Sequence, residues 1–204
     1  QVVKKYRLIF TTSGHGTPGK IRKNLGYKAL AQYETFLKIT NPKSFYRLFD
    51  HYVFKRKSHV LLAILLKILG IFLSLFDPIV RLCYQKQTQD IEIQKEVWSE
   101  RLGRSLDVFW DENKSQFGVT VERTSAFLNW RIFQNPNIKY NFFSTYQDDI
   151  LVGYIITRQA ESGFPAGVIV DVIAKENNPH IIDALVKQAI LDFGERNISY
   201  ITFK

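Results

Sequence analysis

Residues 89–204 alternate between short apolar runs and segments whose apolar positions have helical spacing. The apolar runs predict strands over 90–97, 140–147, 150–158, 166–174 and 198–203. The helical spacing predicts helices over 105–112, 124–133 and 179–193. The polar pair Asp148-Asp149 predicts a hairpin turn between the second and third strands. The pattern therefore indicates one unit in which helices cover a sheet.

The ends of these helices are predicted from residues that cap or stop a helix. Ser105 is the expected N-cap of the first helix, and Asn135-Pro136 stops the second. Asn178, which is followed by a proline, is the expected N-cap of the third helix, and Gly194 is its expected end.

The front of the chain has a different and shorter pattern. Residues 6–12 are aromatic and β-branched and predict a strand, and residues 13–19 are a loop. A short helix begins after Thr17 and ends at Gly26, and extended chain follows to Ile39. The order is strand, loop, short helix and strand.

Residues 14–20 have the G-x-x-x-x-G-K spacing of a nucleotide-binding P-loop. The next residue is Ile21, whereas a P-loop needs a Ser or Thr hydroxyl there as a ligand of Mg²⁺. The helix that follows has room for only about two turns before Gly26. We interpret this segment as a loop that begins a helix, not as a site of nucleotide hydrolysis.

Residues 60–76 are apolar except at Lys67, Gly70 and Ser74, and the basic run 55–57 precedes them. As a helix they would be about 26 Å long, against ~30 Å for the hydrocarbon core of a bilayer. Three interpretations stay open: a helix buried between domains, which the base rate favours, a helix in a membrane interface, and a membrane span. Lys67 argues against the span.

The charge of the chain is concentrated in its front. The 204 residues carry a formal net charge of +9, but residues 1–87 hold sixteen Lys and Arg against three acids, a net of +13, and residues 88–204 have a net of −4. This asymmetry predicts an anionic partner for the front. A hydrophobic content of 46% with 23% charged residues excludes a disordered chain.

Metal and disulfide chemistry have little support in the sequence. Cys83 is the single cysteine, which excludes a disulfide framework and a site of several thiolates. The four histidines, at positions 15, 51, 59 and 180, show no helical pairing, so we expect no metal site. Asp148 and Asp149 are adjacent acids at a turn, which usually only solvate it.

The order of elements in the rear resembles the GNAT N-acyltransferase superfamily, up to the fifth strand of that fold. The segments that carry the resemblance are Phe127–Arg131, Asn135-Pro136 with Tyr140, Gly153-Tyr154 and Gly167–Asp171, and they are similar to the second half of bacterial proteins with two tandem GNAT-like units. In front, Leu25-Gly26-Tyr27 resembles the Leu-Gly-aromatic step before a strand of a first unit. The resemblance covers about 1–39 and 89–204.

The chain departs from the family where chemistry is expected. A catalytic GNAT unit holds the pyrophosphate of acyl-CoA on the N–H groups of an R-x-x-G-x-G/A turn, but residues 174–180 here read Ala-Lys-Glu-Asn-Asn-Pro-His. The tyrosine that often serves as general acid in the family falls on Arg22, which does not give up its proton. No catalytic or cofactor-binding residue can therefore be carried over.

The resemblance implies an α+β fold with a mostly antiparallel sheet flanked by helices, and a strand-helix-strand remnant in front. We predict three parts: a closing remnant of a first unit over 1–50, a basic and apolar helical connector over 51–88, and a second GNAT-like unit over 89–204. The absence of Met, the first residue Gln1 and the strand-like end at 198–204 predict a fragment of a longer polypeptide.

The implied function is acyl transfer to a small-molecule amine, with acetyl-CoA or another acyl-CoA as co-substrate in a longer cytoplasmic, bacterial enzyme and with no metal. The alternative is a non-catalytic GNAT-like interaction module that holds either a partner or, through residues 55–76, an anionic membrane surface. Nucleic acid is an unlikely partner in both, because the rear is acidic and the front has no recognisable nucleic-acid module.

Overall fold

The computed structural model describes residues 24–25, 36–39, 64–65, 68, 72, 91–118, 120–160, 166–196, 198 and 200–203. The chain divides into two compact units, Gln1–Glu34 and Thr35–Lys204. In the first unit, Asn24 is helical and Leu25 lies in a turn, where the sequence predicts the end of the short helix. The predicted strand over 6–12, the P-loop-like segment and Arg22 lie outside the described residues. The predicted boundaries at 50 and 88 stay a prediction.

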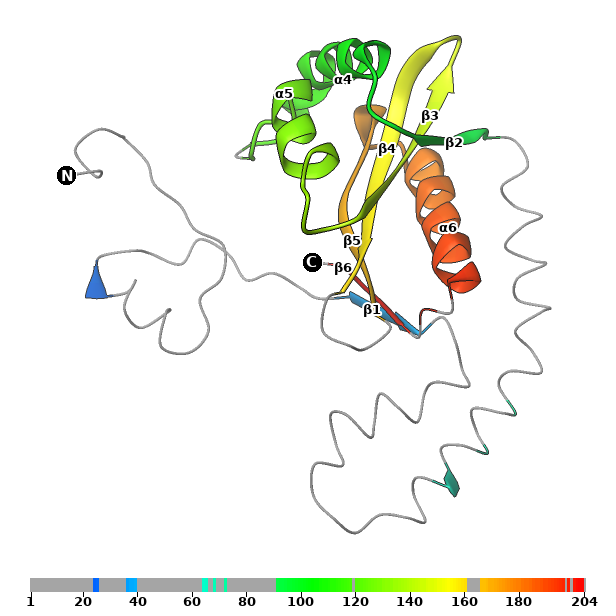
Figure 1. The fold of residues 1–204 in the computed structure, drawn as a ribbon. Helices are drawn as coiled ribbons and strands as arrows, with labels where there is room; N and C mark the ends of the chain where they lie inside the picture. The colour runs from blue at the N-terminus through cyan, green and yellow to red at the C-terminus, as the bar shows by residue number, and fades with distance from the viewer. Residues whose placement is uncertain are drawn as a thin grey trace. The chain divides into compact units, whose positions relative to one another are not determined.

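The described residues of the second unit form a mixed sheet with helices packed on it (Figure 1). The strands are β1 (Phe36–Ile39), β2 (Ile93–Glu96), β3 (Tyr140–Gln147), β4 (Ile150–Gln159), β5 (Ala166–Ala174) and β6 (Tyr200–Phe203). Among the described residues, the helices whose bounds are given are α4 (Glu100–Asn113), α5 (Ser125–Leu128) and α6 (Pro179–Glu195), with the 3-10 turns η3 (Lys114–Gln116) and η5 (Lys175–Asn177) and the π-helical turn η4 (Asn129–Phe133).

The strand order is β1-β6-β5-β4-β3-β2, and every neighbouring pair is antiparallel except β5 and β6, which are parallel. Helix α6 connects this parallel pair. The predicted α+β class is confirmed, as is the prediction that β4 lies between its two sequence neighbours. The sheet also includes β1, which pairs with β6 although the sequence places it in the front segment.

The β3–β4 hairpin turns at Asp148 and Asp149, as predicted from the sequence. Their φ angles of 50° and 63° place both residues in the left-handed region. Two left-handed residues give the type I′ geometry that matches the twist of the strands, and aspartate tolerates this conformation better than most residues.

Helix α4 begins earlier than the sequence predicts, so the assignment of Ser105 as its N-cap is wrong. The cap is Ser99, whose hydroxyl oxygen accepts a hydrogen bond of 3.1 Å from the Leu102 backbone N–H. Ser105 lies inside the helix and donates its hydroxyl to the Arg101 carbonyl oxygen, a bond that a serine can form in mid-helix. Helix α6 is capped by Asn178 as predicted, but it continues past Gly194 to Glu195.

The two faces of the sheet are covered by different helices, α4 and α5 on one and α6 on the other (Figure 1). The core under α4 and α5 contains Leu106, Phe142 and Tyr154, whereas the core under α6 contains Ile155 and Phe193. Adjacent residues 154 and 155 enter opposite cores because side chains alternate along a strand.

Four residues of the predicted 60–76 helix are described. Ile64, Leu65, Ile68 and Phe72 are helical and exposed. At about 100° per residue they lie within one third of the helix circumference. Among the described residues, no helix has the length and apolar character that crossing a membrane would require.

Candidate functional site

The turn between β5 and α6 occupies the position at which the GNAT resemblance places a phosphate-binding turn. Glu176 and Asn177 both have a φ of 53°, a left-handed conformation held without glycine. The Asn178 N–H donates to the Lys175 carbonyl oxygen at 2.9 Å, and the His180 N–H donates to the Asn178 side-chain oxygen at 3.0 Å. These two donors are therefore used inside the protein.

Asn113, the last residue of α4, closes the same turn from inside. Its amide nitrogen donates to the Phe109 carbonyl oxygen at 2.8 Å, which orients its Oδ1 to accept the Glu176 backbone N–H at 3.2 Å. Only 5% of Asn113 is exposed. A phosphate would need N–H groups that point to solvent, and this one points to a buried amide.

A half-buried polar cluster joins the loop before α5 to the middle of β5. Arg123 Nε lies 2.6 Å from Asp171 Oδ2, and Arg123 NH2 lies 3.2 Å from Asp171 Oδ1, so the pair is bidentate. The side chains are 21% and 18% exposed. Burial lowers the pKa of Arg123, but the hydrogen bonds and the charge of Asp171 outweigh it and raise that pKa.

Tyr154, on β4, completes the cluster. Its hydroxyl lies 3.3 Å from Asp171 Oδ2, and the residue is only 1% exposed. Burial, together with the negative charge of Asp171, raises the pKa of Tyr154 well above its ordinary range, although Arg123 acts in the opposite direction. The hydroxyl therefore stays protonated and donates to the carboxylate. The ring stacks on Phe142 with centroids 5.1 Å apart.

Two aromatic rings lie beside the Arg123 guanidinium. Its Cζ is 5.7 Å from the Trp110 ring centroid and 5.6 Å from the Phe117 ring centroid. The two rings stack on each other at 5.9 Å. Such distances give a cation an additional favourable electrostatic interaction with the ring faces.

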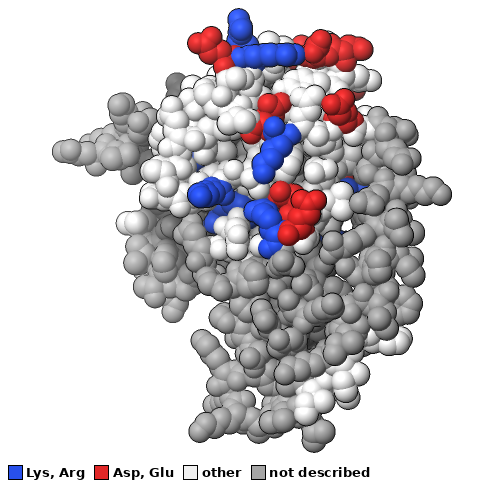
Figure 2. All heavy atoms as spheres, turned by 45° about the vertical axis from the view of Figure 1, so that its right-hand side comes forward, with Lys and Arg blue, Asp and Glu red and all other residues white. Residues whose placement is uncertain are grey.

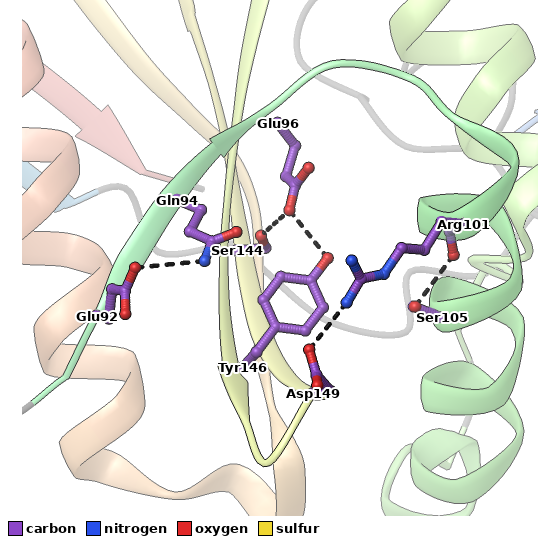
Figure 3. A network of polar contacts seen from close by, with 8 residues as sticks. All are labelled: Glu92, Gln94, Glu96, Arg101, Ser105, Ser144, Tyr146 and Asp149. Atoms are coloured by element: carbon purple, nitrogen blue, oxygen red, sulfur yellow. Dashed lines mark hydrogen bonds and ion pairs between the residues drawn. The ribbon is translucent and has the colours of Figure 1, made fainter.

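A second polar network lies at the β2 edge of the sheet, where β2, β3 and the start of α4 meet (Figure 3). Glu96 Oε1 accepts hydrogen bonds from the Ser144 hydroxyl at 2.6 Å and the Tyr146 hydroxyl at 2.9 Å. Burial, followed by the hydrogen bond to Glu96, raises the pKa of Tyr146 to about 12. These hydroxyls are donors to one carboxylate and tie the short strand β2 to β3.

The acids at the hairpin turn belong to the rim of this network. Asp149 Oδ1 lies 2.9 Å from Arg101 NH2, but the two side chains are 90% and 75% exposed, so the pair contributes little stability. His180 is exposed in the first turn of α6, as predicted. Within the described ranges, His, Cys, Asp and Glu form no group that could hold a metal ion. Cys83 and the other histidines lie outside those ranges.

Basic and acidic side chains of the described residues lie intermixed on the face that Figure 2 shows. Lys187 pairs with Asp183 on α6, and Arg196, the C-cap of that helix, pairs with Asp192. Intermixed charges are typical of a solvated surface and do not form a one-signed patch for an anionic polymer.

Sequence reasoning did not single out Asn113, Arg123 or Asp171 as site residues. Asp171 interrupts an otherwise apolar strand, Val168 to Ile173, and Asn113 continues the apolar stripe of α4. A polar residue at a position that the pattern assigns to the core is the signal that could have indicated them. Their partners could not be read in the same way, because these lie far away along the chain.

The chain matches no family model and no curated protein. It is similar to a solved ribosomal-protein-alanine N-acetyltransferase from Brucella melitensis biovar Abortus 2308, with 16% identity and a TM-score of 0.42 over 56% of this chain and 79% of that one. It is also similar to an aminoglycoside acetyltransferase from an uncultured soil metagenomic sample, with 14% identity and a TM-score of 0.42 over 56% of this chain and 76% of that one. A third similar structure is a tandem GNAT protein from the clavulanic acid biosynthesis pathway, with 11% identity and a TM-score of 0.40 over 53% of this chain and 34% of that one.

Proposed function

We propose that this protein transfers an acyl group from acetyl-CoA or another acyl-CoA to a small-molecule amine, and that the unit containing the described residues 91–203 contacts the amine. In this reaction the amine nitrogen bonds to the thioester carbon, the carbon–sulfur bond breaks, and the amine proton passes to the departing thiolate. The observation that carries the proposal is the carboxylate of Asp171, 18% exposed, on β5, a central strand of the sheet.

The register of β5 supports a role for the segment around Asp171. On the β6 side, the described pairing covers only Ala166 to Ile169. On the β4 side, Asp171 pairs with Ile156. Asp171 therefore lies beyond the last position that the described part of β6 pairs. Its carboxylate faces Arg123 and Tyr154 on the side of the sheet that α4 and α5 cover.

The β5–α6 turn supports the second half of the proposal, that this unit does not itself hold the pyrophosphate. Asn113 already accepts the Glu176 N–H, Pro179 has no N–H, and the Glu176 carboxylate would repel a phosphate. We place the acyl-CoA on a part of the protein other than this turn. The unit then contributes acceptor recognition, and the phosphate anchor is separate.

The experiment measures release of the CoA thiol from acetyl-CoA, with a thiol reagent, by the protein expressed from its complete coding sequence. The amines offered are a polyamine, an aminoglycoside and a peptide with an N-terminal alanine. We expect release that depends on one of the amines, and a rate at least tenfold lower in Asp171→Asn, which keeps the size of the side chain. The matched control is Asp111→Asn on the exposed face of α4. A folded protein that releases no thiol with any amine or acyl donor would contradict the proposal.

The second candidate is a non-catalytic GNAT-like module that associates with an anionic membrane surface. The observation that favours it is the exposed apolar stripe of Ile64, Leu65, Ile68 and Phe72, close in sequence to the basic run 55–57. Thiol release separates the two candidates, because a module without catalysis releases none. Vesicle binding gives the complementary measurement.

A further inference from the structure

Arg123 fills a place on this unit that has the features of a cation-binding site: a carboxylate, two aromatic rings and partial exposure to solvent. We infer that the amine acceptor carries a guanidinium group that takes the place of Arg123 on Asp171. The inference rests on the proposed function and names its substrate class, a cationic amine. In the present structure the chain's own arginine is the occupant.

The polar contacts of Arg123 fall into two groups. Nε and NH2 contact the two carboxylate oxygens of Asp171, at 2.6 and 3.2 Å. NH1 contacts the Thr120 hydroxyl at 2.5 Å and the Val121 carbonyl oxygen at 3.0 Å. Thr120 and Val121 belong to the same loop as Arg123. Through these contacts Arg123 ties its loop to the sheet by way of the carboxylate of Asp171.

The surroundings of Asp171 are suited to a cation even without Arg123. The Tyr154 hydroxyl lies 3.3 Å from Asp171 Oδ2, so the carboxylate keeps a hydrogen-bond donor when the arginine leaves. The rings of Trp110 and Phe117 stack on each other, and their position does not depend on the guanidinium alone. A ligand cation would find the same carboxylate and the same ring faces.

The loop can release Arg123 without unfolding its neighbours, because both ends of the loop are held separately. At one end, the Ser125 N–H and hydroxyl each donate to the carboxylate of Asp107 on α4 at 2.7 Å. At the other end, Phe117 stacks on Trp110. With 21% of the Arg123 side chain and 18% of the Asp171 side chain exposed, the pair is within reach of a ligand in solution.

The geometry favours a guanidinium over a simple ammonium. A carboxylate engaged by two N–H groups of one planar fork matches a guanidinium, whereas an ammonium makes point contacts. A urea has a similar planar shape but no charge, so it should not compete with Arg123. Agmatine, which has a guanidinium at one end and a primary amine at the other, is therefore the best probe, and carbamoylputrescine, its urea counterpart, is the matched control.

The test is a titration of the wild-type 204-residue chain, followed by the NMR signal of the Arg123 Nε–H. We expect agmatine to shift this signal in a saturable way, and to bind at least about tenfold more tightly than carbamoylputrescine. Asp171→Asn should abolish the difference between the two probes. Arg123→Gln should bind agmatine about tenfold more tightly than wild type, because the competing cation is gone.

If the Arg123 signal of folded wild-type protein does not respond to agmatine, Arg123 is a fixed structural partner of Asp171 and the inference is wrong. This arm needs no variant, so it decides the question even if Arg123→Gln does not fold. Equal binding of the two probes would also contradict the inference. If the protein releases thiol with a neutral amine but does not bind agmatine, the cationic acceptor is rejected and acyl transfer is kept. If the protein binds agmatine but releases no thiol, only acyl transfer is rejected.

Discussion

Replacing Gly153 by alanine probes how closely α6 lies on the sheet beside the β5–α6 turn. A β-carbon at this position would lie 2.7 Å from Ile181 Cγ2, 3.1 Å from the Ile173 carbonyl oxygen and 3.2 Å from Leu185 Cδ1. Carbon atoms pack best at about 3.5 to 4.0 Å, so the Ile181 methyl group would have to move by roughly 0.8 Å. The Ile173 carbonyl oxygen is fixed by the sheet, so the new β-carbon cannot move away from α6. The side chains of Ile181 and Leu185, and α6 with them, must therefore shift.

The expected cost combines two opposing effects. Overfilling a packed core costs about 1–3 kcal/mol. Alanine also restricts the unfolded chain relative to glycine, which returns about 0.4–1 kcal/mol. We therefore expect Gly153→Ala to lower the free energy of unfolding by about 1–2 kcal/mol. The shift concerns the first turn of α6, so hydrogen exchange at Glu176 should also become faster.

The assay is urea denaturation followed by far-ultraviolet circular dichroism. Gly118→Ala is the matched control, because nothing lies within 4 Å of a β-carbon at Gly118. Adding Ile181→Ala to Gly153→Ala should restore part of the loss, so the double variant should be more stable than the sum of the single effects predicts. If Gly153→Ala is as stable as Gly118→Ala, the argument from close packing is refuted.

Three further outcomes follow from the same structure. Acetyl-CoA titrated calorimetrically into the 204-residue chain should bind no more tightly than about 1 mM, because the Glu176 N–H is already engaged; micromolar binding would contradict this. A tyrosine in an unfolded chain loses its proton at about pH 10, whereas folded Tyr146 keeps its proton until about pH 12. The contribution of Tyr146 to stability is therefore present below about pH 10 and is lost as the pH rises toward 12. If the free energies of unfolding of wild type and Tyr146→Phe decrease in parallel over this pH range, the prediction is rejected. Binding to anionic vesicles, measured by co-sedimentation, should weaken with salt and with Ile68→Asp if the exposed stripe lies at a membrane surface; binding that neither perturbation changes would reject that arrangement.

Local signals in the sequence predict most elements of the rear unit. The hairpin at Asp148-Asp149 and the cap at Asn178 lie within a few residues of the structure that they form, so their effect can be read directly. The wrong cap at Ser105 shows the limit of this reasoning. Ser99 and Ser105 are both possible caps by residue type, and the helix extends back to Ser99 because Leu102 and Leu106 are both buried in the same core.

The candidate site was decided by tertiary structure. Arg123 and Asp171 are 48 residues apart, and Asn113 and Glu176 are 63 residues apart. Neither pair has a periodic pattern that would indicate its partner, because contacts between distant segments are set by how α4 and the loop after it pack on β5. The pairing of β1 with β6 is of the same kind. The sequence by itself determined which segments form strands and helices, because these depend on neighbouring residues. Packing determined which polar groups meet, because a buried polar group must find its hydrogen-bond partner among the groups that the fold brings beside it.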